Sequence, residues 1–425
     1  MTSMELRQAL AGLLTLSMFI MLGNMVKKDH FDPYFSVDVE ATPSTSGTVT
    51  VTGQSLATVS HLSKETSKQT ADSLKPCWNP PMLKESEQSK GFITFSLTNG
   101  PEYHLSQIAD AVVVARYVGA TLVLPDIRSS KQGYRMNFGD IYDVQKFLDS
   151  LNGIVKVTRT QPPQASSNGN LPTVKVPNRV TEDYIERIVK PIYQAKGTLR
   201  IESNFPSSLI INSTMAPSDQ KKKKNLMNPA ACKAMFGSLQ LQQEVQEVVG
   251  SMVHKLRTWS QNLNGKFIAV DFKSEMCDAQ RGRNSCYKAD EIGVFLKKLG
   301  FGQETVVYVT QLRWHSDLDA LKNIFPKTYT KESIIPEEKR GKFLNSEISE
   351  YEKVIDFNLC SESDVFVPSL PDLFYTNVVA VRIASGKNQI LVPSDEIASN
   401  NAASASDFIS PYVSQKTHFA YSCFC

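Results

Sequence analysis

The distribution of hydrophobic residues divides the chain into three parts, and the first is an almost unbroken apolar run from Ala9 to Val26, closed by Lys27 and Lys28. At about 1.5 Å per helical residue the run would extend about 27 Å, close to the roughly 30 Å hydrocarbon core of a bilayer. No clear small-x-small cleavage site follows it. The pattern therefore favours an uncleaved signal anchor, with a cleaved signal peptide as the alternative. Arg7 precedes the run and the two lysines follow it, so the positive-inside rule does not fix the orientation.

The second part, residues 29–89, is polar and has few hydrophobic residues at regular spacing. Serine and threonine are frequent in it, most densely between Thr42 and Thr52. A segment of this composition cannot bury enough apolar surface to offset the entropy lost on ordering it. We therefore expect a tail and anchor helix over residues 1–28, followed by a flexible stem over residues 29–89.

The third part begins with a strand–loop–helix pattern. Phe92–Leu97 is a short apolar run that predicts a strand, and an Asn-Gly-Pro turn follows it at residues 99–101. Hydrophobic residues then recur at helical spacing as far as Gly119, and Thr121–Pro125 predicts a second strand. Such a βαβ unit implies a parallel sheet with a right-handed crossover. Its first loop lies at the carboxyl edge, where open α/β sheets bind ligands; a tight turn without a ligand is the alternative.

The same pattern starts again after a helical stretch, Leu239–Trp259, and a polar break at residues 260–265. We expect strands at Lys266–Lys273, Val306–Val309, Asp364–Pro368 and Gln389–Pro393, and helices at Ala289–Leu299, Asp317–Asn323 and Leu370–Ser385. Two consecutive α/β halves predict two Rossmann-like domains that face each other across a cleft, a common place for a small-molecule site. The first domain is expected over residues 90–260 and the second over residues 261–425.

Composition and charge exclude one class of function. The chain is 41% hydrophobic and 21% charged, as is typical of a globular protein. Its net charge is only +3, and no basic stripe with interleaved aromatic residues is present, so we expect no nucleic-acid partner. The one dense basic cluster, Lys221–Lys224, is interpreted as a solvated loop, with a phosphate or lipid contact as the alternative.

Cysteines and a glycosylation sequon carry information about the compartment. The seven cysteines include no C-x-x-C pair and have no histidine nearby at zinc-ligand spacing, so we expect no metal site among them. In an oxidising compartment Cys277 and Cys286 could close a short loop, and the odd count leaves at least one thiol free or intermolecular. Asn212-Ser213-Thr214 is the single standard sequon, and it is usable only if the body of the chain is luminal.

A series of short strings forms a recognisable pattern along the third part. In chain order they are Thr98-Asn99-Gly100, Asp110-Ala111-Val112, Ala120–Pro125, Phe267–Lys273, Phe325–Glu332 and Glu362–Pro368. These strings resemble the plant GDP-fucose O-fucosyltransferase-like family. The mannan-synthesis-related subgroup is the most similar within it, on the strings Glu5–Gln8, Asp29–Asp32, Leu97–His104 and Ala420–Cys425. The resemblance covers nearly the whole chain except the stem.

The resemblance has implications for fold, location and activity. It implies a GT-B-type glycosyltransferase fold, which is α/β with two Rossmann-like domains, behind a single N-terminal transmembrane helix. It also implies a single-pass type II protein of the Golgi membrane with its body in the lumen, where Asn212 is a glycosylation site. The implied activity is a metal-independent transfer from a GDP-sugar donor to a glycan or polysaccharide acceptor in mannan or glucomannan synthesis.

The resemblance also implies which residues bind the donor. The wider family has a His-x-Arg motif at the end of the strand that opens the second domain, where this chain has Asp271-Phe272-Lys273. Lys273 would therefore contact the donor diphosphate as a single compact charge, with a surface lysine as the alternative. The other implied substrate-binding residues are Asn99, Gly100, Ser363, Asp364, Phe366 and Arg382. For these the alternatives are structural: a tight turn, a loop cap and a salt bridge.

Transfer to a hydroxyl group also requires a base. Asp271 and Glu102 are the candidate catalytic residues, and solvated carboxylates at the rim of the cleft are the alternative. Asp317-Leu318-Asp319 has the Asp-x-Asp spacing that metal-dependent glycosyltransferases use. Because it lies at the start of an expected helix, we interpret it as a helix cap and expect no metal and no further cofactor.

Three functions remain open from the sequence. The first is an active Golgi glycosyltransferase, which the two complete α/β halves favour. The second is a non-catalytic accessory protein that binds and supports a mannan synthase, which Asp271 in place of the family's histidine favours. The third is a lectin-like protein that holds mannan or a primer glycan in the cleft.

Overall fold

The computed structural model describes residues 74–82, 91–129, 133–160, 171–205, 227–273, 286–344, 349–394 and 404–424. The expected anchor, most of the stem, Asn212, the Lys221–Lys224 run and Cys277 lie outside these residues. Within the described ranges, none of the helices combines the length and the apolar character needed to span a membrane. All described residues belong to one compact unit, residues 53–425.

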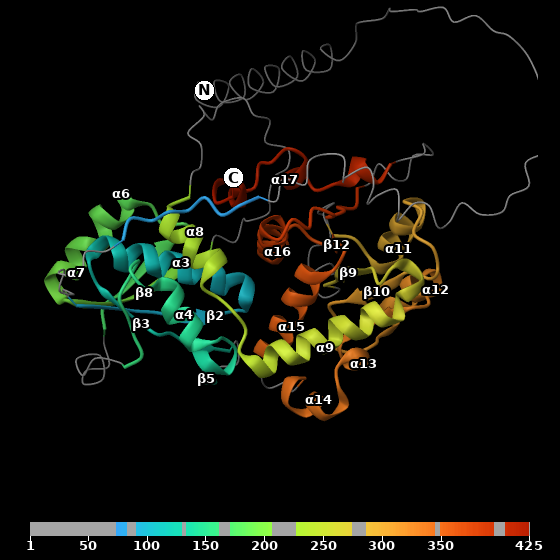
Figure 1. Cartoon of the computed structure of the whole chain (residues 1–425), viewed down its shortest axis with the longest axis horizontal. Helices are drawn as coiled ribbons and strands as arrows, with labels where there is room; N and C mark the ends of the chain where they lie inside the picture. Colours follow the sequence, from blue (N-terminus) through green and yellow to red (C-terminus); the bar gives the residue numbers. More distant parts are fainter. Residues whose placement is uncertain are drawn as a thin grey trace, which may run out of the picture. The chain divides into compact units, whose positions relative to one another are not determined.

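The first half of this unit is built on a parallel sheet with the strand order β6-β3-β1-β8-β7 (Figure 1). Its strands are β1 (Phe92–Thr94), β3 (Thr121–Val123), β6 (Val157–Thr158), β7 (Thr173–Pro177) and β8 (Thr198–Asn204). Helix α3 (Pro101–Val118) connects β1 to β3, which pair in parallel. The expected parallel βαβ arrangement is therefore confirmed, but the single strand expected at Phe92–Leu97 is divided into β1 and a second strand, Ser96–Thr98, that belongs to another sheet.

A smaller sheet extends this half. It has the strand order β2-β4-β5, in which β2 and β4 pair in parallel and β4 and β5 antiparallel. Its strands are β2 (Ser96–Thr98), β4 (Asp126–Arg128) and β5 (Arg135–Asn137). The helices of the first half besides α3 are η2 (Phe138–Asp140), α4 (Val144–Leu151), α6 (Glu182–Tyr184), η3 (Ile185–Val189), α7 (Lys190–Lys196) and α8 (Pro229–Gly237).

Helix α3 has clear local reasons for both of its ends. Gly100 precedes it with a φ of 110°, a backbone conformation that favours glycine. Pro101 follows at the first helical position, where a missing N–H costs no hydrogen bond. Gly119 ends the helix in the left-handed conformation, with a φ of 70°. The helix therefore starts directly after the loop that the sequence predicts to be functional.

The second half is built on a four-stranded parallel sheet with the order β11-β10-β9-β12. Its strands are β9 (Phe267–Asp271), β10 (Val306–Val309), β11 (Thr328–Tyr329) and β12 (Val365–Pro368). Every residue of β9, β10 and β12 is buried, as expected for parallel strands covered on both faces. The predicted strands that correspond to these three are confirmed.

The helices of the second half surround this sheet. They are α9 (Gln243–Trp259), η4 (Gln261–Leu263), α11 (Ala289–Lys298), η5 (Ser316–Leu318), α12 (Asp319–Ile324), α13 (Lys331–Ile334), α14 (Glu337–Phe343), α15 (Ser349–Glu362), α16 (Leu373–Ala384), η7 (Ala405–Phe408), α17 (Pro411–Ser414) and η8 (Phe419–Ser422). The sequence predicted α11 and α16 within a few residues. It did not predict α15, which packs between α3, α9 and α16.

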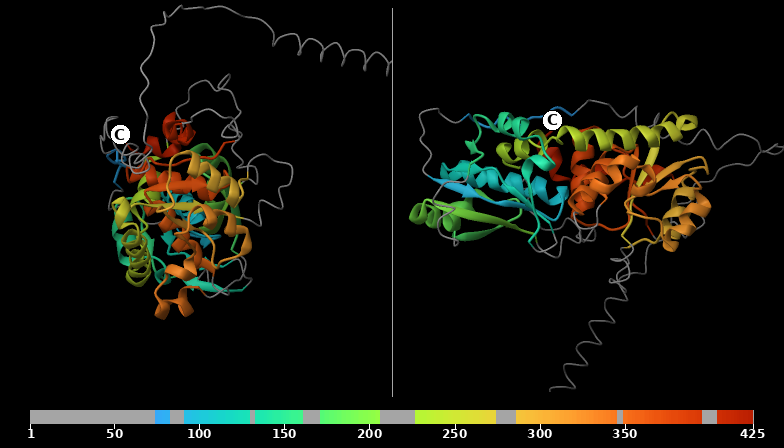
Figure 2. Two further views of the ribbon diagram at one scale, coloured as in Figure 1. Left: turned by 90° about the vertical axis from the view of Figure 1, so that its right-hand side faces the viewer. Right: turned by 90° about the horizontal axis from the view of Figure 1, so that it is seen from below.

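Two predictions about the second half differ from the structure. The strand expected at Gln389–Pro393 is wrong, because Ile390 forms only an isolated bridge with Phe366 before Leu391 pairs with Ile409. Helix α9 was expected in the first domain, but it packs against α13, α15 and β10. Figures 1 and 2 show α9, in yellow, lying along the second half. The chain therefore enters the second half before α9 and not at residue 260.

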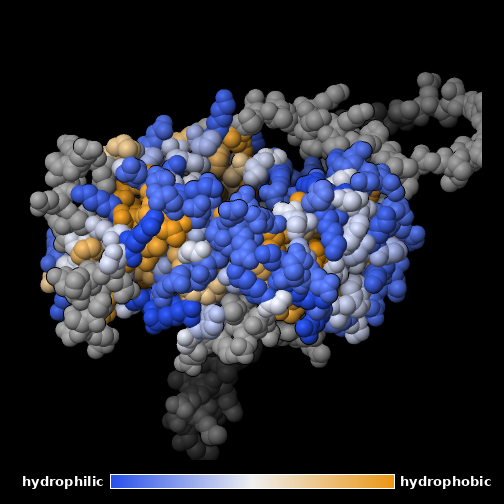
Figure 3. All heavy atoms as spheres, turned by 60° about the horizontal axis from the view of Figure 1, so that its bottom comes forward, coloured by the Kyte–Doolittle hydropathy of each residue, from blue (hydrophilic) through white to orange (hydrophobic). Residues whose placement is uncertain are grey.

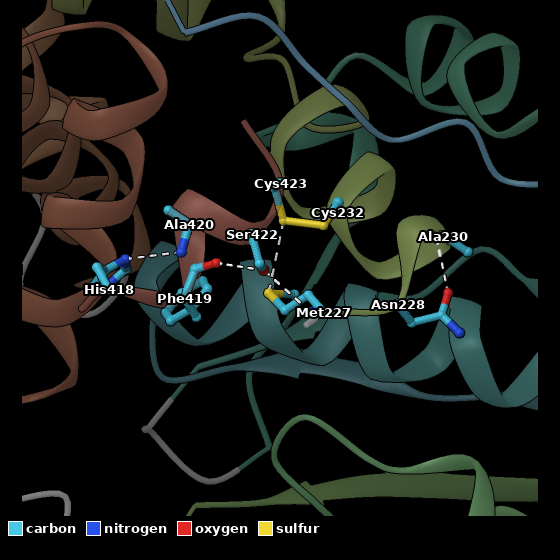
Figure 4. Close-up of a disulfide and its surroundings, with 9 residues drawn as sticks. All are labelled: Met227, Asn228, Ala230, Cys232, His418, Phe419, Ala420, Ser422 and Cys423. Carbon is cyan, nitrogen blue, oxygen red and sulfur yellow. Dashed lines mark hydrogen bonds between the residues drawn. A yellow bond between two sulfur atoms is a disulfide. The ribbon is translucent and has the colours of Figure 1, made fainter. Parts of the chain in front are cut away.

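The end of the chain returns to the first half (Figure 4). A disulfide joins Cys232 of α8 to Cys423, which are 191 positions apart in the sequence. Met227 N donates a hydrogen bond to Ser422 Oγ at 3.1 Å. Among the described cysteines Cys360 is free, and it is buried. The disulfide connects the two halves at one place, and the chain connects them at another, where it passes from the first half into helix α9.

Candidate functional site

Three charged residues meet at the carboxyl edge of the second sheet. Asp271 is the last residue of β9 and pairs in register with Pro368, the last residue of β12. Lys273 follows β9, and its Nζ lies 3.2 Å from Asp271 Oδ2 and 2.5 Å from Asp372 Oδ2. The same Nζ lies 4.7 Å from the centroid of the Phe374 ring, a cation–π contact. Lys273 is thus held between two carboxylates over an aromatic ring.

The ionisation of this group follows from its burial and its charges. Burial by itself would lower the pKa of Lys273, but the nearby Asp271 and Asp372 outweigh it and raise that pKa above the ordinary lysine value. Asp271 is only 1% exposed, and burial raises the pKa of its carboxyl although Lys273 opposes the change. Thr310 Oγ1 donates a hydrogen bond to Asp271 Oδ1 at 3.1 Å. Lys273 therefore stays charged, and Asp271 is held by a hydrogen bond on Oδ1 and by the ion pair with Lys273 on Oδ2.

Glu102 brings a carboxyl from the first half toward this group. It is the second residue of α3 and is 9% exposed. Burial raises the pKa of Glu102 to about 8, with Lys273 and Lys353 acting against the shift and Asp372 adding to it. Its Oε2 is buried and has no hydrogen-bond partner among the described residues. A buried carboxyl with a strongly raised pKa is a typical candidate for acid–base catalysis.

The loop before α3 fits closely against the second half. A Cβ atom at Gly100 would lie 2.7 Å from Glu102 Oε2 and 3.0 Å from Lys353 Cδ, so a larger residue there would displace the carboxyl. Asn377 Nδ2 of α16 donates a hydrogen bond to the carbonyl oxygen of Glu102 at 2.5 Å. The structure thus brings Gly100 and Glu102 near Lys273, Asp271 and Asp372, and the two halves both contribute to one polar site.

A second polar cluster lies beside Glu102. His104 is fully buried, and its Nδ1 lies 2.8 Å from Tyr142 Oη. Burial lowers the pKa of His104 to about 3, so its imidazole is neutral. Glu350 is also fully buried, and its Oε1 accepts a hydrogen bond from Lys353 Nζ at 2.9 Å. His104 Nε2 and Glu350 Oε2 lack hydrogen-bond partners in the described part of the chain, so this region keeps two buried polar atoms whose hydrogen bonds are not made there.

Sequence reasoning missed the loop between β12 and α16. Asp372 lies in it, four residues after the end of β12, and pairs with Lys273. Ser369 lies there too, with a fully buried hydroxyl that has no partner among the described residues, and its N–H donates to Asp271 O at 3.0 Å. The signal was present, because the strand at residues 364–368 was expected and ligands bind beyond the carboxyl ends of such strands.

Several residues predicted to bind substrate lie elsewhere. Asp364 precedes β12 at the amino edge of the sheet, where its Oδ2 accepts hydrogen bonds from Phe267 N at 3.0 Å and Arg257 Nη1 at 3.2 Å. The four residues of β12 separate this edge from the carboxyl edge by about 13 Å. Phe366 is fully buried within β12. Asn99 is exposed, with a φ of 68°. Asp364 and Phe366 thus have structural contacts and not a place beside Lys273.

Arg382 and Ser363 form a structural clamp at that amino edge. Arg382 is fully buried, and its guanidinium donates hydrogen bonds to Ser363 Oγ and to the carbonyl oxygens of Cys360, Ser363, Asp364 and Gln389. Burial lowers the pKa of Arg382 to about 10. Because these groups are already bonded within the protein, the geometry gives Arg382 and Ser363 a role in holding the turn between α15 and β12 instead of the predicted substrate contacts.

Metal binding has no visible basis in the parts of the chain that the structure describes. No group of three or more histidine, cysteine or acidic residues there could hold an ion. Asp317 pairs with His315 at 3.5 Å, and Asp319 accepts a hydrogen bond from Trp314 Nε1 at 2.8 Å.

The face shown in Figure 3 is largely hydrophilic, with hydrophobic atoms gathered in patches between hydrophilic ones.

Known proteins resemble this chain along its whole length. Residues 104–382 match the family model of GDP-fucose protein O-fucosyltransferase. "Protein MANNAN SYNTHESIS-RELATED" of Trigonella foenum-graecum is 57% identical over 433 residues, which cover 100% of both chains. "Protein MANNAN SYNTHESIS-RELATED 1" of Arabidopsis thaliana is 48% identical over 431 residues, which cover 99% of both.

Solved structures show a weaker likeness. A crystal structure of POFUT1 in complex with GDP covers 69% of this chain and 94% of that chain, with 12% identity and a TM-score of 0.39. The family model and the two full-length relatives, and not the solved structures, determine to which family the chain belongs. The chain belongs to the GDP-fucose protein O-fucosyltransferase family.

Proposed function

We propose that this protein is a Golgi glycosyltransferase of the O-fucosyltransferase type, which uses a GDP-sugar donor and promotes the synthesis of mannan or glucomannan. The observation that carries the proposal is the buried Glu102 carboxyl of the first half, whose Oε2 has no partner among the described residues. Its backbone oxygen accepts a hydrogen bond from Asn377 of α16, the helix that Asp372 caps beside Lys273. Membership of the family supports the transfer chemistry. The names of the two relatives support the product class.

In the proposed reaction a hydroxyl oxygen of the acceptor attacks the anomeric carbon of the donor sugar. The bond from that carbon to the β-phosphate oxygen breaks, and its electron pair leaves with GDP. Glu102 accepts the hydroxyl proton, and a raised pKa makes its ionised form a strong base. Lys273 places positive charge where negative charge develops on the diphosphate, so the reaction requires no metal ion.

Asp271 was the other candidate base, and the geometry favours a supporting role for it. One of its oxygens accepts a hydrogen bond from Thr310 and the other pairs with Lys273. A carboxylate engaged in this way holds the lysine in place. Asp271 Oδ2 and Glu102 Oε2 both lack a hydrogen bond among the described residues, but only Asp271 Oδ2 lies in an ion pair there, with Lys273. We therefore assign proton transfer to Glu102 and the positioning of Lys273 to Asp271.

The proposed location is the Golgi membrane, with a single N-terminal span in type II orientation and the body in the lumen. The disulfide between Cys232 and Cys423 supports an oxidising compartment, and Cys77 and Cys286 are also disulfide-bonded. On this proposal Asn212 is glycosylated. Deglycosylation of the full-length protein should change its electrophoretic mobility, and sealed vesicles should protect the body from protease. Unchanged mobility together with loss of the body would contradict the orientation.

Transfer activity is tested with the purified full chain and GDP-mannose, GDP-fucose and a UDP-sugar as donors, in the presence of mannan oligosaccharides. We expect turnover with a GDP-sugar, and we expect Glu102→Gln to reduce it by about 100-fold or more. Glu247→Gln is the matched control, because Glu247 is an exposed glutamate on α9. Equal turnover by the Glu102 variant and the control would contradict the assignment of the base.

A second candidate function is a non-catalytic accessory protein that binds and supports a mannan synthase. The pairing of Lys273 with two carboxylates favours it, because these neutralise the charge that a diphosphate needs. The two functions separate in cells that lack the protein. A Glu102→Gln, Lys273→Ala double variant that folds and binds its partner should fail to restore mannan if the protein is an enzyme. Full restoration would favour the accessory function.

A further inference from the structure

Asp372 makes two contacts at once. Its Oδ1 accepts a hydrogen bond from Tyr375 N at 2.9 Å and so caps the first turn of α16, a helix of 12 residues. Its Oδ2 lies 2.5 Å from Lys273 Nζ. A helix N-terminus and a basic side chain at the carboxyl edge of a parallel sheet are the two features that bind phosphate groups in such folds. In this protein a carboxylate of the chain itself already occupies both.

The two carboxylates that hold Lys273 differ in their freedom to move. The Asp271 side chain is 1% exposed and is fixed by Thr310, so separating it from Lys273 would leave a buried charge without a partner. The Asp372 side chain is 23% exposed. Asp372 is therefore the partner that can release Lys273 at a small cost, because water can solvate the Asp372 carboxylate once it has moved away.

Lys273 keeps its position when Asp372 moves away. Asp271 remains 3.2 Å from its Nζ, and the Phe374 ring still lies beneath the ammonium. Ser369, in the same loop as Asp372, contributes a fully buried hydroxyl without a partner among the described residues. Lys273 would then be a cation in a fixed position that is available to an incoming anion.

We propose that Asp372 is an internal anion that occupies the diphosphate position of the donor site, and that the donor binds when Lys273 exchanges Asp372 for the diphosphate. The inference rests on the proposed function, because a GDP-sugar supplies that diphosphate. Asp372 is a positioning residue in this account. It keeps Lys273 neutralised in the empty site, competes with the donor and returns to Lys273 when GDP leaves.

The substitution Asp372→Asn isolates the charge from the helix cap. Asparagine caps helices about as well as aspartate, so the contact with Tyr375 N is retained and only the negative charge disappears. We expect the full-length variant to bind GDP about fivefold to twentyfold more tightly than the wild type in calorimetry, because a neutral asparagine does not compete with the diphosphate for Lys273. The KM for the GDP-sugar should fall in parallel. A substitution that damaged the site would instead weaken GDP binding and raise the KM for the GDP-sugar.

The chain offers a matched control in Asp143. This residue also caps a helix, since its Oδ1 accepts a hydrogen bond from Lys146 N at 3.0 Å, and its Oδ2 lies 3.7 Å from Lys146 Nζ. It lies at the start of α4 in the first half. Asp143→Asn therefore removes the same charge from the same kind of cap. Its affinity for GDP should equal that of the wild type.

A double-mutant cycle connects the gain to Lys273. In a Lys273→Met background Asp372→Asn should no longer tighten GDP binding, because no lysine is left to release. If the methionine variant does not fold, Lys273→Arg replaces it, and there the gain should be kept. Unchanged or weaker GDP binding by Asp372→Asn, with Asp143→Asn like the wild type, would overturn the proposal.

The proposal and the enzymatic function can fail separately. If Asp372→Asn tightens GDP binding but none of the proteins transfers sugar, the exchange stands and the enzymatic function fails. If the wild type transfers sugar and Asp372→Asn leaves GDP affinity unchanged, the enzymatic function stands and the exchange fails. Absence of GDP binding in the wild type and in both variants would overturn the exchange and the use of a GDP-sugar together.

Discussion

Replacing Glu102 by glutamine should make the protein more stable at neutral pH and less active. The carboxyl is 9% exposed, and burial raises its pKa to about 8. Keeping this group in the folded protein therefore costs free energy at any pH at which the unfolded chain would ionise it. Glutamine has nearly the same shape and does not titrate. Opposite effects on stability and activity are typical of a residue held in an unfavourable environment for its function.

The size of the effect follows from the two pKa values. The ordinary pKa of the carboxyl is 4.5, and its pKa in the folded protein is about 8. Between these values the unfolded chain releases a proton that the folded protein keeps, so the free energy of unfolding falls by about 1.4 kcal/mol per pH unit. The stabilising effect is complete below about pH 4.5 and is lost as the pH rises toward 8. At pH 7 the loss from Glu102 is about 3 kcal/mol.

The assay is urea unfolding of wild type, Glu102→Gln and the exposed control Glu247→Gln at pH 5 and pH 7. The difference between Glu102→Gln and wild type should grow by about 2.5 kcal/mol between the two pH values, and the control should show no such growth. Because packing changes affect both pH values equally, the comparison isolates the titration of Glu102. A constant difference, or a variant less stable than wild type at pH 7, would refute the reasoning.

Four further predictions follow from the site and its support. If Glu102 is the base, kcat/KM should rise about tenfold per pH unit and level off above about pH 8, and an optimum near pH 6 in initial-rate measurements would contradict this. Lys273→Ala should lose about 1.5–3 kcal/mol of GDP binding in calorimetry, and Lys273→Arg should retain it. Cys232→Ser should lower the free energy of unfolding by about 2–5 kcal/mol, measured against wild type without reductant. Arg382→Lys should reduce stability by about 3 kcal/mol and leave the GDP affinity of the folded protein unchanged, because its contacts are structural.

Much of the fold could be predicted because the second half keeps strong local signals. β9, β10 and β12 are short apolar runs, and their burial on both faces makes the runs continuous. Helix α15 lacks such a signal. It packs against elements on several sides, so its buried residues, among them Ile355, Phe357 and Cys360, do not form one stripe at helical spacing. The assignment of α9 to a half also depends on tertiary packing that local periodicity does not contain.

The site was predictable only where it is local in sequence. Gly100, Glu102 and Lys273 directly follow or adjoin expected strands. They could be predicted because ligands bind beyond the carboxyl ends of the strands in open α/β sheets. Lys353 lies on the unpredicted helix α15 with its partner Glu350, and it comes near Glu102 only through the packing of the two halves. The resemblance gave Asp364 and Arg382 binding roles, but the structure uses them to hold the amino edge of the sheet.

The replacement of arginine by lysine at position 273 agrees with an exchange of partners. An arginine would hold a carboxylate through two parallel hydrogen bonds, whereas a lysine offers one compact charge with rotatable donors. With Asp372 at 2.5 Å and Asp271 at 3.2 Å, an arginine in a bidentate pair with Asp372 would make release of Asp372 more costly. The same fork would bind the diphosphate more strongly, so the affinity for GDP would stay similar. Lys273 can instead change one partner while it keeps the other. The departure from His-x-Arg and the internal carboxylate are therefore two parts of one arrangement, in which the donor must compete for a charge that the protein otherwise neutralises.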